Sequence, residues 1–314
     1  MTLLPVEPAW RLTERAEENR WLVTGLWSEQ AVGIVGGEPK CCKSFLALDL
    51  AVAVAAGVPC LRRFAVQQAG RVLLFAAEDA LHIVRRRLEG IAIAAGVELA
   101  DLDIQVITAP TVRLDLDADR RNLAETVARL QPRLLILDPF VRLHRIDENA
   151  SGEVAPLLAY LRELQRRHGV AVLVVHHAKK GGNSARAGQA LRGSSEFHAW
   201  GDSNLYLRRD GDDISLAVEH RAAPSPKPIR IELTSRGDAL ALEVADRREP
   251  AMPAPTTLDD RIMTVLAAAD SLLLFTELRA LCRVRTATLY ERLAVLIADG
   301  RVVKIDDGYR LPER

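Results

Sequence analysis

Eight consecutive residues, Gly37 to Ser44, combine glycine, lysine and a hydroxyl at a spacing suited to phosphate binding. They read GEPKCCKS, follow the short apolar run 32–35 and precede an apolar, alanine-rich segment with a helical pattern, FLALDLAVAVAAG. A strand, a tight loop, a Lys-Ser pair and a helix together place backbone N–H groups around an anion. In such a loop Lys43 reaches the β- and γ-phosphates of a nucleotide, and Ser44 binds Mg²⁺. The alternative is a chance turn between a strand and a helix.

A cysteine stands at position 42, where this kind of loop has a glycine before the lysine. A Cβ and a thiol restrict the backbone there, so we expect Cys42 to weaken nucleotide binding or slow turnover. The residues expected to bind the nucleotide are those of the loop and the start of the helix: Gly37, Glu38, Pro39, Lys40, Cys41, Cys42, Lys43, Ser44 and Phe45.

Two further apolar segments end in carboxylates. The run 72–77 is followed by Glu78 and Asp79, and the run 134–137 is followed by Asp138. Continuous apolar runs are typical of parallel strands buried on both faces, and ligands bind at the carboxyl ends of such strands. We expect Asp138 to bind the same Mg²⁺ as the loop hydroxyl and Glu78 to orient or deprotonate an attacking water. Glu78 could instead cap a helix, a role for which Asp79 is the better candidate.

A third apolar run, 170–175, ends in two histidines. A polar group at this strand end can sense the γ-phosphate, and we assign that role to His177; the alternative is a hydrogen-bonded histidine pair. The segment that follows is rich in Gly, Ser and Ala, which predicts a mobile loop. It carries three basic residues that could contact DNA, Lys179, Lys180 and Arg186.

Composition limits the remaining possibilities. Of 314 residues, 49% are hydrophobic and 27% are charged, a balance typical of a globular chain with one large and one small domain. The 42 basic and 42 acidic residues cancel, which excludes an overall basic field, so any contact with nucleic acid must be local. The four cysteines lack zinc-ligand spacing, and no apolar run is long enough to span a membrane. These features favour a reduced cytoplasmic protein.

The sequence divides into an N-terminal arm (1–30), an α/β domain (31–246), a Pro/Ala-rich linker (247–257) and a small C-terminal domain (258–314). The last region has the pattern of three short helices and a hairpin, which describes a winged helix.

Three residues are expected on the exposed face of its third helix, Arg285, Thr288 and Arg292. Residues 259–314 hold nine basic and nine acidic residues, so DNA binding and docking of a protein partner stay open alternatives.

Residues 20–246 resemble the RecA-like ATPases of the RepA class, the hexameric replicative helicases of plasmids, and more broadly their DnaB and RadA relatives. Five motifs carry the resemblance in order along the chain: GEPKCCKS, the Ala-Ala-Glu-Asp strand end, LLILDP, VVHHAKK and ALRGSS. The resemblance implies a mostly parallel RecA-like sheet, binding of ATP and Mg²⁺, ATP hydrolysis, and a homo-oligomeric ring that acts on DNA.

The same resemblance implies individual roles. Lys43 and Ser44 bind phosphate and Mg²⁺, Glu78 is the catalytic carboxylate, and Asp138 is the aspartate of the second half of the phosphate-loop site. The further catalytic residues are Arg87, which matches an arginine near the phosphates, His177 at the γ-phosphate position, and Arg192 or Arg208 as the arginine that acts on the neighbouring subunit. The chain is then either a DNA motor of the helicase type or an ATP-switched regulator or loader that recruits partners through its winged helix; a monomeric nucleotide-binding transcription factor is a weaker third alternative.

Overall fold

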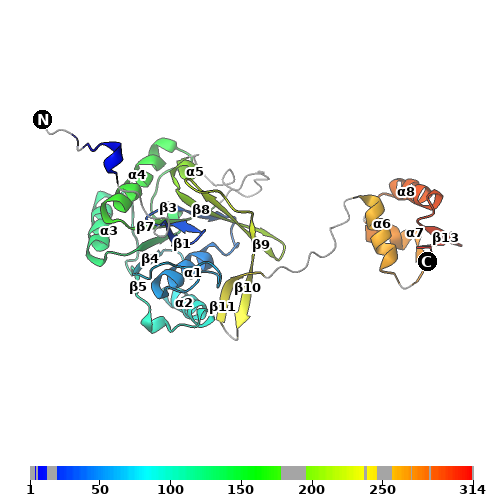
Figure 1. Ribbon diagram of the computed structural model, residues 1–314, viewed down its shortest axis with the longest axis horizontal. Coiled ribbons are helices and arrows are strands. Elements are labelled where there is room, and N and C mark those ends of the chain that lie inside the picture. Colours follow the sequence, from blue (N-terminus) through cyan, green and yellow to red (C-terminus); the bar gives the residue numbers. More distant parts are fainter. Residues whose placement is uncertain are drawn as a thin grey trace. The chain divides into compact units, whose positions relative to one another are not determined.

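The computed structural model describes residues 4, 6–12, 20–177, 196–236, 239–245, 257–269, 271–282 and 284–312 (Figure 1). The chain divides into two compact units, residues 1–245 and residues 246–314. Most of the predicted linker, residues 247–256, lies outside the described residues.

The larger unit contains eleven named strands within its described residues. They are β1 Trp21–Val23, β2 Trp27–Ser28, β3 Val32–Gly37, β4 Val72–Ala76, β5 Ile104–Val106, β6 Leu134–Asp138, β7 Ala171–His177, β8 Ser203–Asp210, β9 Asp213–His220, β10 Ile229–Arg236 and β11 Ala239–Val244. The helices are α1 Lys43–Ala56, α2 Leu81–Ala95, α3 Asp117–Leu130, α4 Ser151–His168 and α5 Glu196–Trp200, with 3-10 turns η1 Ala9–Arg11, η3 Leu99–Asp101 and η4 Phe140–Arg142.

Nine of these strands form one sheet in the order β11-β10-β9-β8-β3-β7-β6-β4-β5. The six strands from β8 to β5 are parallel, and β9, β10 and β11 extend the sheet beyond β8, each antiparallel to its neighbour. The prediction of a mostly parallel central sheet is therefore confirmed.

Helices cover both faces of the sheet (Figure 1). On one face the side chains of β3, β4 and β7 pack against α1 and α2; on the other, the alternate side chains of the same strands pack against α3 and α4. This double coverage explains why the parallel strands read as continuous apolar runs. Helix α1 is apolar on all sides because it is buried against the sheet, α2 and the β11 edge.

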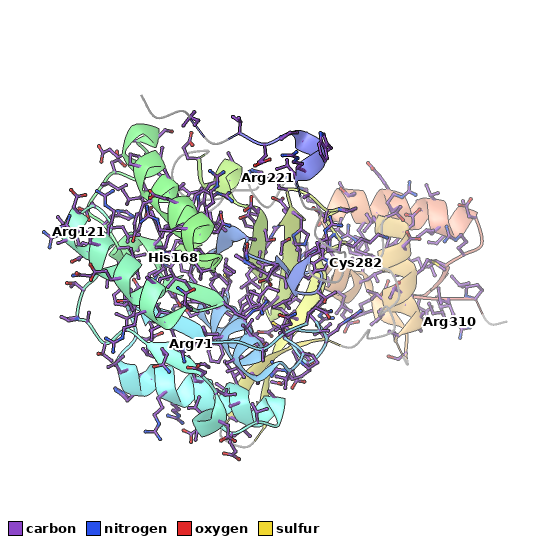
Figure 2. All side chains as sticks on the ribbon, turned by 60° about the vertical axis from the view of Figure 1, so that its left-hand side comes forward. Arg71, Arg121, His168, Arg221, Cys282 and Arg310 are labelled. Atoms are coloured by element: carbon purple, nitrogen blue, oxygen red, sulfur yellow. The ribbon has the colours of Figure 1, made fainter. Side chains whose placement is uncertain are left out.

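Because the strands are parallel, their amino ends lie along one edge of the sheet and their carboxyl ends along the opposite edge. Arg71 and His168, both labelled in Figure 2, come just before β4 and β7, at the amino ends of the strands. Arg71 is bound there by the Asp103 carboxylate (2.7 Å) and the Leu130 carbonyl (2.7 Å). The carboxyl ends, at the opposite edge, carry the phosphate-loop sequence and the strand-end carboxylates.

The sequence-based boundary of the N-terminal arm needs correction. Residues 21–28 form the β1–β2 hairpin, and Leu22, Val23, Leu26 and Trp27 are fully buried in the core. The aromatic and charged composition of this stretch resembles that of an arm, but its apolar side chains belong to the larger unit. Residues 13–19 lie outside the described residues.

The smaller unit contains α6 Leu258–Ala267, β12 Leu273–Leu274, α7 Phe275–Cys282, α8 Thr286–Ala298, β13 Val303–Ile305 and β14 Gly308–Arg310. Its sheet has the order β12-β14-β13, and its core includes Ile262, Leu278, Cys282, Leu289 and Leu293. The three helices and the hairpin expected from the sequence are present; strand β12 was not expected.

A buried ion pair holds the segment after α1. Asp49 of α1 is fully buried, accepts a hydrogen bond from the Leu61 backbone N–H (2.7 Å), and is paired with Arg62. Burial raises the pKa of Asp49 and the Arg62 charge opposes that rise. Leu61 and Arg62 both have positive φ (50° and 60°), so the pair helps to hold an unfavourable backbone turn.

We predict that Arg62→Ala lowers the free energy of unfolding by about 3 kcal/mol, because it leaves the Asp49 carboxylate buried without its countercharge. Urea unfolding followed by circular dichroism measures the change. The exposed neighbour provides the control, and Arg63→Ala should be nearly neutral. Equal stability of the two variants would contradict the role of the buried pair.

Candidate active site

The phosphate-loop sequence lies between β3 and α1 in the middle of the parallel sheet. Strand β3 pairs with β7 on one side and β8 on the other, so Gly37 lies opposite His177 and Leu207. Gly37 has φ 152°, and a Cβ added there would overlap the Leu207 carbonyl oxygen. Only glycine therefore allows β8 to approach the base of the loop so closely.

The loop itself contains two left-handed residues with side chains. Lys40 has φ 65° and Cys42 has φ 68°. This conformation is uncommon for residues other than glycine, so the expected backbone restriction at Cys42 has a direct geometric basis. Burial raises the pKa of the Cys42 thiol, while the nearby charges of Arg209, Lys43 and Arg87 lower it.

Lys43 opens α1 and is buried. Its Nζ donates to the Glu38 carbonyl at 2.7 Å and lies 3.8 Å from the Cys41 Sγ. The ammonium thus folds back over the loop, where it can exchange the carbonyl for a phosphate oxygen.

Ser44 and Asp138 meet across the strand ends. The Ser44 hydroxyl is hydrogen-bonded to the Asp138 carboxylate, which is almost fully buried at the end of β6. Burial raises the pKa of Asp138 to about 6; the Ser44 hydrogen bond opposes the rise, and the charges of Asp79 and Glu78 add to it. A hydroxyl and a carboxylate side by side, with the carboxylates of Glu78 and Asp79 nearby, fit a hard cation such as Mg²⁺.

A cavity of about 350 Å³ joins these groups. Its lining includes many of the residues selected from the sequence: Lys40, Cys42, Lys43, Ser44, Phe45, Glu78, Arg87, Asp138 and His177. Ala76, Asp79 and Val175 complete it. The loop residues Gly37, Glu38, Pro39 and Cys41 form the base and backbone of the loop, and Cys41 is buried beneath it.

The acidic pair after β4 contacts two arginines. Glu78 Oε1 accepts a hydrogen bond from Arg142 Nε at 3.0 Å, and Asp79 is paired with Arg87. Arg87 also lies over the Phe45 ring, 5.3 Å from its centroid. Neither carboxylate caps α2, because its N-cap is Ala80 and no side chain bonds there. The capping alternative for Glu78 is therefore wrong.

The two histidines at the end of β7 have different surroundings. His176 is buried and stacks on Phe197, with ring centroids 4.2 Å apart and planes inclined by 21°. His177 is half-buried and lines the cavity. The alternating direction of strand side chains thus assigns one histidine to the core and the other to the site.

The other residues selected from the sequence do not line this cavity in the part of the larger unit that the structure describes, or they belong to the smaller unit or to undescribed segments. Lys179, Lys180, Arg186 and Arg192 lie outside the described residues. Arg208 is exposed near the end of β8. In the smaller unit Arg285 and Thr288 are exposed at the start of α8, whereas Arg292 makes two hydrogen bonds with the Asp259 carboxylate.

Sequence reasoning missed two arginines near the site, Arg142 beside Glu78 and Arg209 beside the loop. Arg142 comes from the η4 turn, immediately after the strand that ends at Asp138. No sequence pattern in this short connection indicates that the Arg142 side chain contacts Glu78. Strand alternation places Arg209 on the same sheet face as Leu205 and Leu207, but the sequence does not show that this face is the one that carries the loop.

The mostly parallel sheet, with a Lys-Ser loop between β3 and α1, is that of a RecA-like domain. A family profile described as an AAA domain matches residues 2–183, more than half of the chain. The chain belongs to this AAA domain family.

Among solved structures, the chain is similar to one from "The Structure Of A DnaB-Like Replicative Helicase And Its Interactions With Primase". The two share 14% identity with a TM-score of 0.52, over 68% of this chain and 57% of that chain. The likeness concerns the fold, and this chain corresponds to little more than half the length of that one.

We predict that Cys42→Gly raises nucleotide affinity or turnover, because glycine adopts φ 68° without the roughly 1 kcal/mol penalty of a side chain. Titration with a fluorescent ATP analogue measures the affinity, and phosphate release measures the turnover. Cys42→Ala retains a Cβ and serves as the control. If the glycine variant is less active than the wild type, the thiol is adapted to this site and the strain argument fails.

A second prediction concerns Asp138. Since its pKa is raised to about 6, this group stabilises the folded state fully only at acidic pH, and that contribution is lost as the pH rises through 6. Asp138→Asn should therefore stabilise the nucleotide-free protein above pH 7, on the order of 1–3 kcal/mol, while weakening Mg²⁺ binding.

Thermal unfolding at pH 5 and pH 8 tests this expectation, and the gain should shrink at the lower pH. Asp101→Asn, at an exposed carboxylate, is the control. An Asp138 variant that is less stable than the wild type at pH 8 would contradict the electrostatic argument.

Proposed function

We propose that this chain binds Mg²⁺-ATP at the β3–α1 loop and hydrolyses it. The observation that carries the proposal is the cavity that joins Lys43, Ser44, Asp138 and Glu78 at the carboxyl edge of the parallel sheet. A phosphate-binding ammonium, a hydroxyl–carboxylate pair suited to Mg²⁺ and a further carboxylate are the parts that phosphoryl transfer to water needs.

Each group has a distinct role in this proposal. Lys43 exchanges its bond to the Glu38 carbonyl for the β- and γ-phosphates and neutralises charge that develops there. Glu78 orients the attacking water, and His177 responds to the γ-phosphate.

Ser44 and Asp138 would hold Mg²⁺, which supplies further neutralisation when bound. Arg87 is held in the site by Asp79 and the Phe45 ring, and approaches the phosphates from the α2 side.

We propose that the active form is a homo-oligomeric ring, for which the RepA resemblance implies a hexamer. In that class an arginine from the next subunit completes the phosphate site, and Arg192 and Arg208 are the candidates. Arg208 is exposed, as a residue that reaches a neighbouring subunit must be.

For the smaller unit we propose a winged helix. Its helix order and its three-stranded sheet support this assignment. The exposed Arg285 and Thr288 at the start of α8 fit contact with DNA. If Lys179, Lys180 and Arg186 contact DNA in the channel of the proposed ring, the chain would act as a RepA-like DNA helicase or translocase.

The alternative is an ATP-switched regulator or loader that recruits a partner without unwinding DNA. Two observations favour it over a DNA-reading helix. Arg292 is engaged by Asp259, and α8 exposes Tyr290 (68%) and Val295 (43%), apolar surface that suits a protein better than DNA phosphates.

We predict that Lys43→Ala abolishes ATP hydrolysis, because it leaves the phosphate charge uncompensated.

Glu78→Gln should retain ATP binding and lose hydrolysis, because the amide keeps the shape of the side chain but cannot act as a base. Phosphate release and binding of a fluorescent ATP analogue, measured on the same preparations, separate the two effects.

Unchanged hydrolysis in the Lys43 variant would contradict the phosphate-loop assignment. Joint loss of binding and hydrolysis in the Glu78 variant would make Glu78 structural.

The helicase and the regulator or loader differ in how DNA changes their ATP hydrolysis. A helicase should hydrolyse ATP much faster with single-stranded DNA, whereas for a regulator or loader neither single-stranded nor duplex DNA should change the rate much. Measuring phosphate release without DNA, with single-stranded DNA and with duplex DNA distinguishes them.

A further inference from the structure

Strand β8 presents alternate side chains to the two faces of the sheet. Leu205 and Leu207 pack in the core cluster that contains α1, while Tyr206 packs in the cluster that contains α4. Because side chains alternate along a strand, Arg209 continues the α1 face and Arg208 the opposite one. Helix α1, which packs on this face, directly follows the phosphate loop.

Arg209 reaches the apex of that loop. Its Nη1 donates to the Lys40 carbonyl at 3.3 Å, and its Nε donates to the Gly211 carbonyl at 3.1 Å. Lys40 has a left-handed backbone (φ 65°), so the hydrogen bond fixes one of the two strained residues of the loop. The same guanidinium therefore connects the apex of the loop to the β8–β9 turn. Strand β8 is also the strand that lies directly beside Gly37.

The Arg209 guanidinium also interacts electrostatically with the loop of its own chain. Its charge acts on Cys42, together with those of Lys43 and Arg87. An arginine that reaches only a neighbouring subunit would make no such contacts in a single chain.

We infer that Arg209 is a positioning residue of the phosphate loop in its own subunit, holding the apex in the shape that binds a nucleotide. The inference rests on the proposed nucleotide-binding function and adds to it a residue that works in cis. It separates two adjacent arginines by role: Arg209 serves its own loop, and Arg208 stays available for a neighbour.

Three variants test the inference: Arg209→Ala, Arg209→Lys and the control Asp210→Ala, at the exposed residue that ends β8. Arg209→Ala should raise the KM for ATP and the Kd of a fluorescent ATP analogue about fivefold, the size expected for one lost hydrogen bond. Its kcat should change less than twofold, because the loop holds ground state and transition state alike. Arg209→Lys should recover part of the affinity, and Asp210→Ala should match the wild type.

Hydrogen exchange of the nucleotide-free protein gives a readout that does not depend on ATP. Amides of residues 38–42 should exchange faster in Arg209→Ala and at the wild-type rate in Asp210→Ala. If the wild type binds no ATP but this difference is seen, the proposed function fails while the contact is upheld.

Three results would overturn the inference. The first is loop exchange and ATP affinity unchanged in Arg209→Ala. The second is a fall in kcat at constant KM, which would make Arg209 a residue of the chemical step. The third is restored activity on mixing Arg209→Ala with Lys43→Ala chains, which would place its action on a neighbouring subunit.

Discussion

The site depends on the parallel pairing of β3 with both β7 and β8. This register brings Gly37 level with His177 on one side and Leu207 on the other. The loop that follows is consequently enclosed by two strand ends, and α1 begins directly behind it. Because Gly37 has no Cβ, β8 can lie close to the base of the loop. A side chain at position 37 would push β8 away, and Arg209 could then not reach the apex of the loop.

The site contains unfavourable interactions in its backbone and among its carboxylates, and the proposed Mg²⁺ would relieve the crowding of the carboxylates. Lys40 and Cys42 are held in left-handed conformations, and Asp138 is buried near Glu78 and Asp79. Such strain and charge crowding are tolerated where the surrounding fold is strongly determined. Here the sheet and α1 provide that support, with apolar contacts on both faces.

Much of this architecture could be predicted from the sequence because it follows from periodicity and spacing. The continuous apolar runs before Glu78, Asp138 and His176 predicted strands buried on both faces, and each carboxylate lies at the end or just beyond the end of its strand. The GEPKCCKS spacing predicted a loop followed by a helix, and α1 begins at Lys43.

Other features depend on contacts between distant segments and could not be predicted in this way. The burial of residues 22–27 results from their packing on the core rather than from any local pattern. The pairs Arg142–Glu78 and Arg87–Asp79 form because the segment after β4, the η4 turn after β6 and the middle of α2 meet at one edge of the sheet. The choice between Arg208 and Arg209 required knowing which face of β8 points toward α1.

The central claim is that the cavity beside Lys43 is a Mg²⁺-ATP site, and isothermal titration calorimetry of the wild-type chain tests it most directly. The account predicts saturable binding of one ATP per chain, tighter with Mg²⁺ than with EDTA, and weaker binding of AMP, which lacks the β- and γ-phosphates. Absence of ATP binding under both conditions, or equal affinity for AMP and ATP, would contradict it.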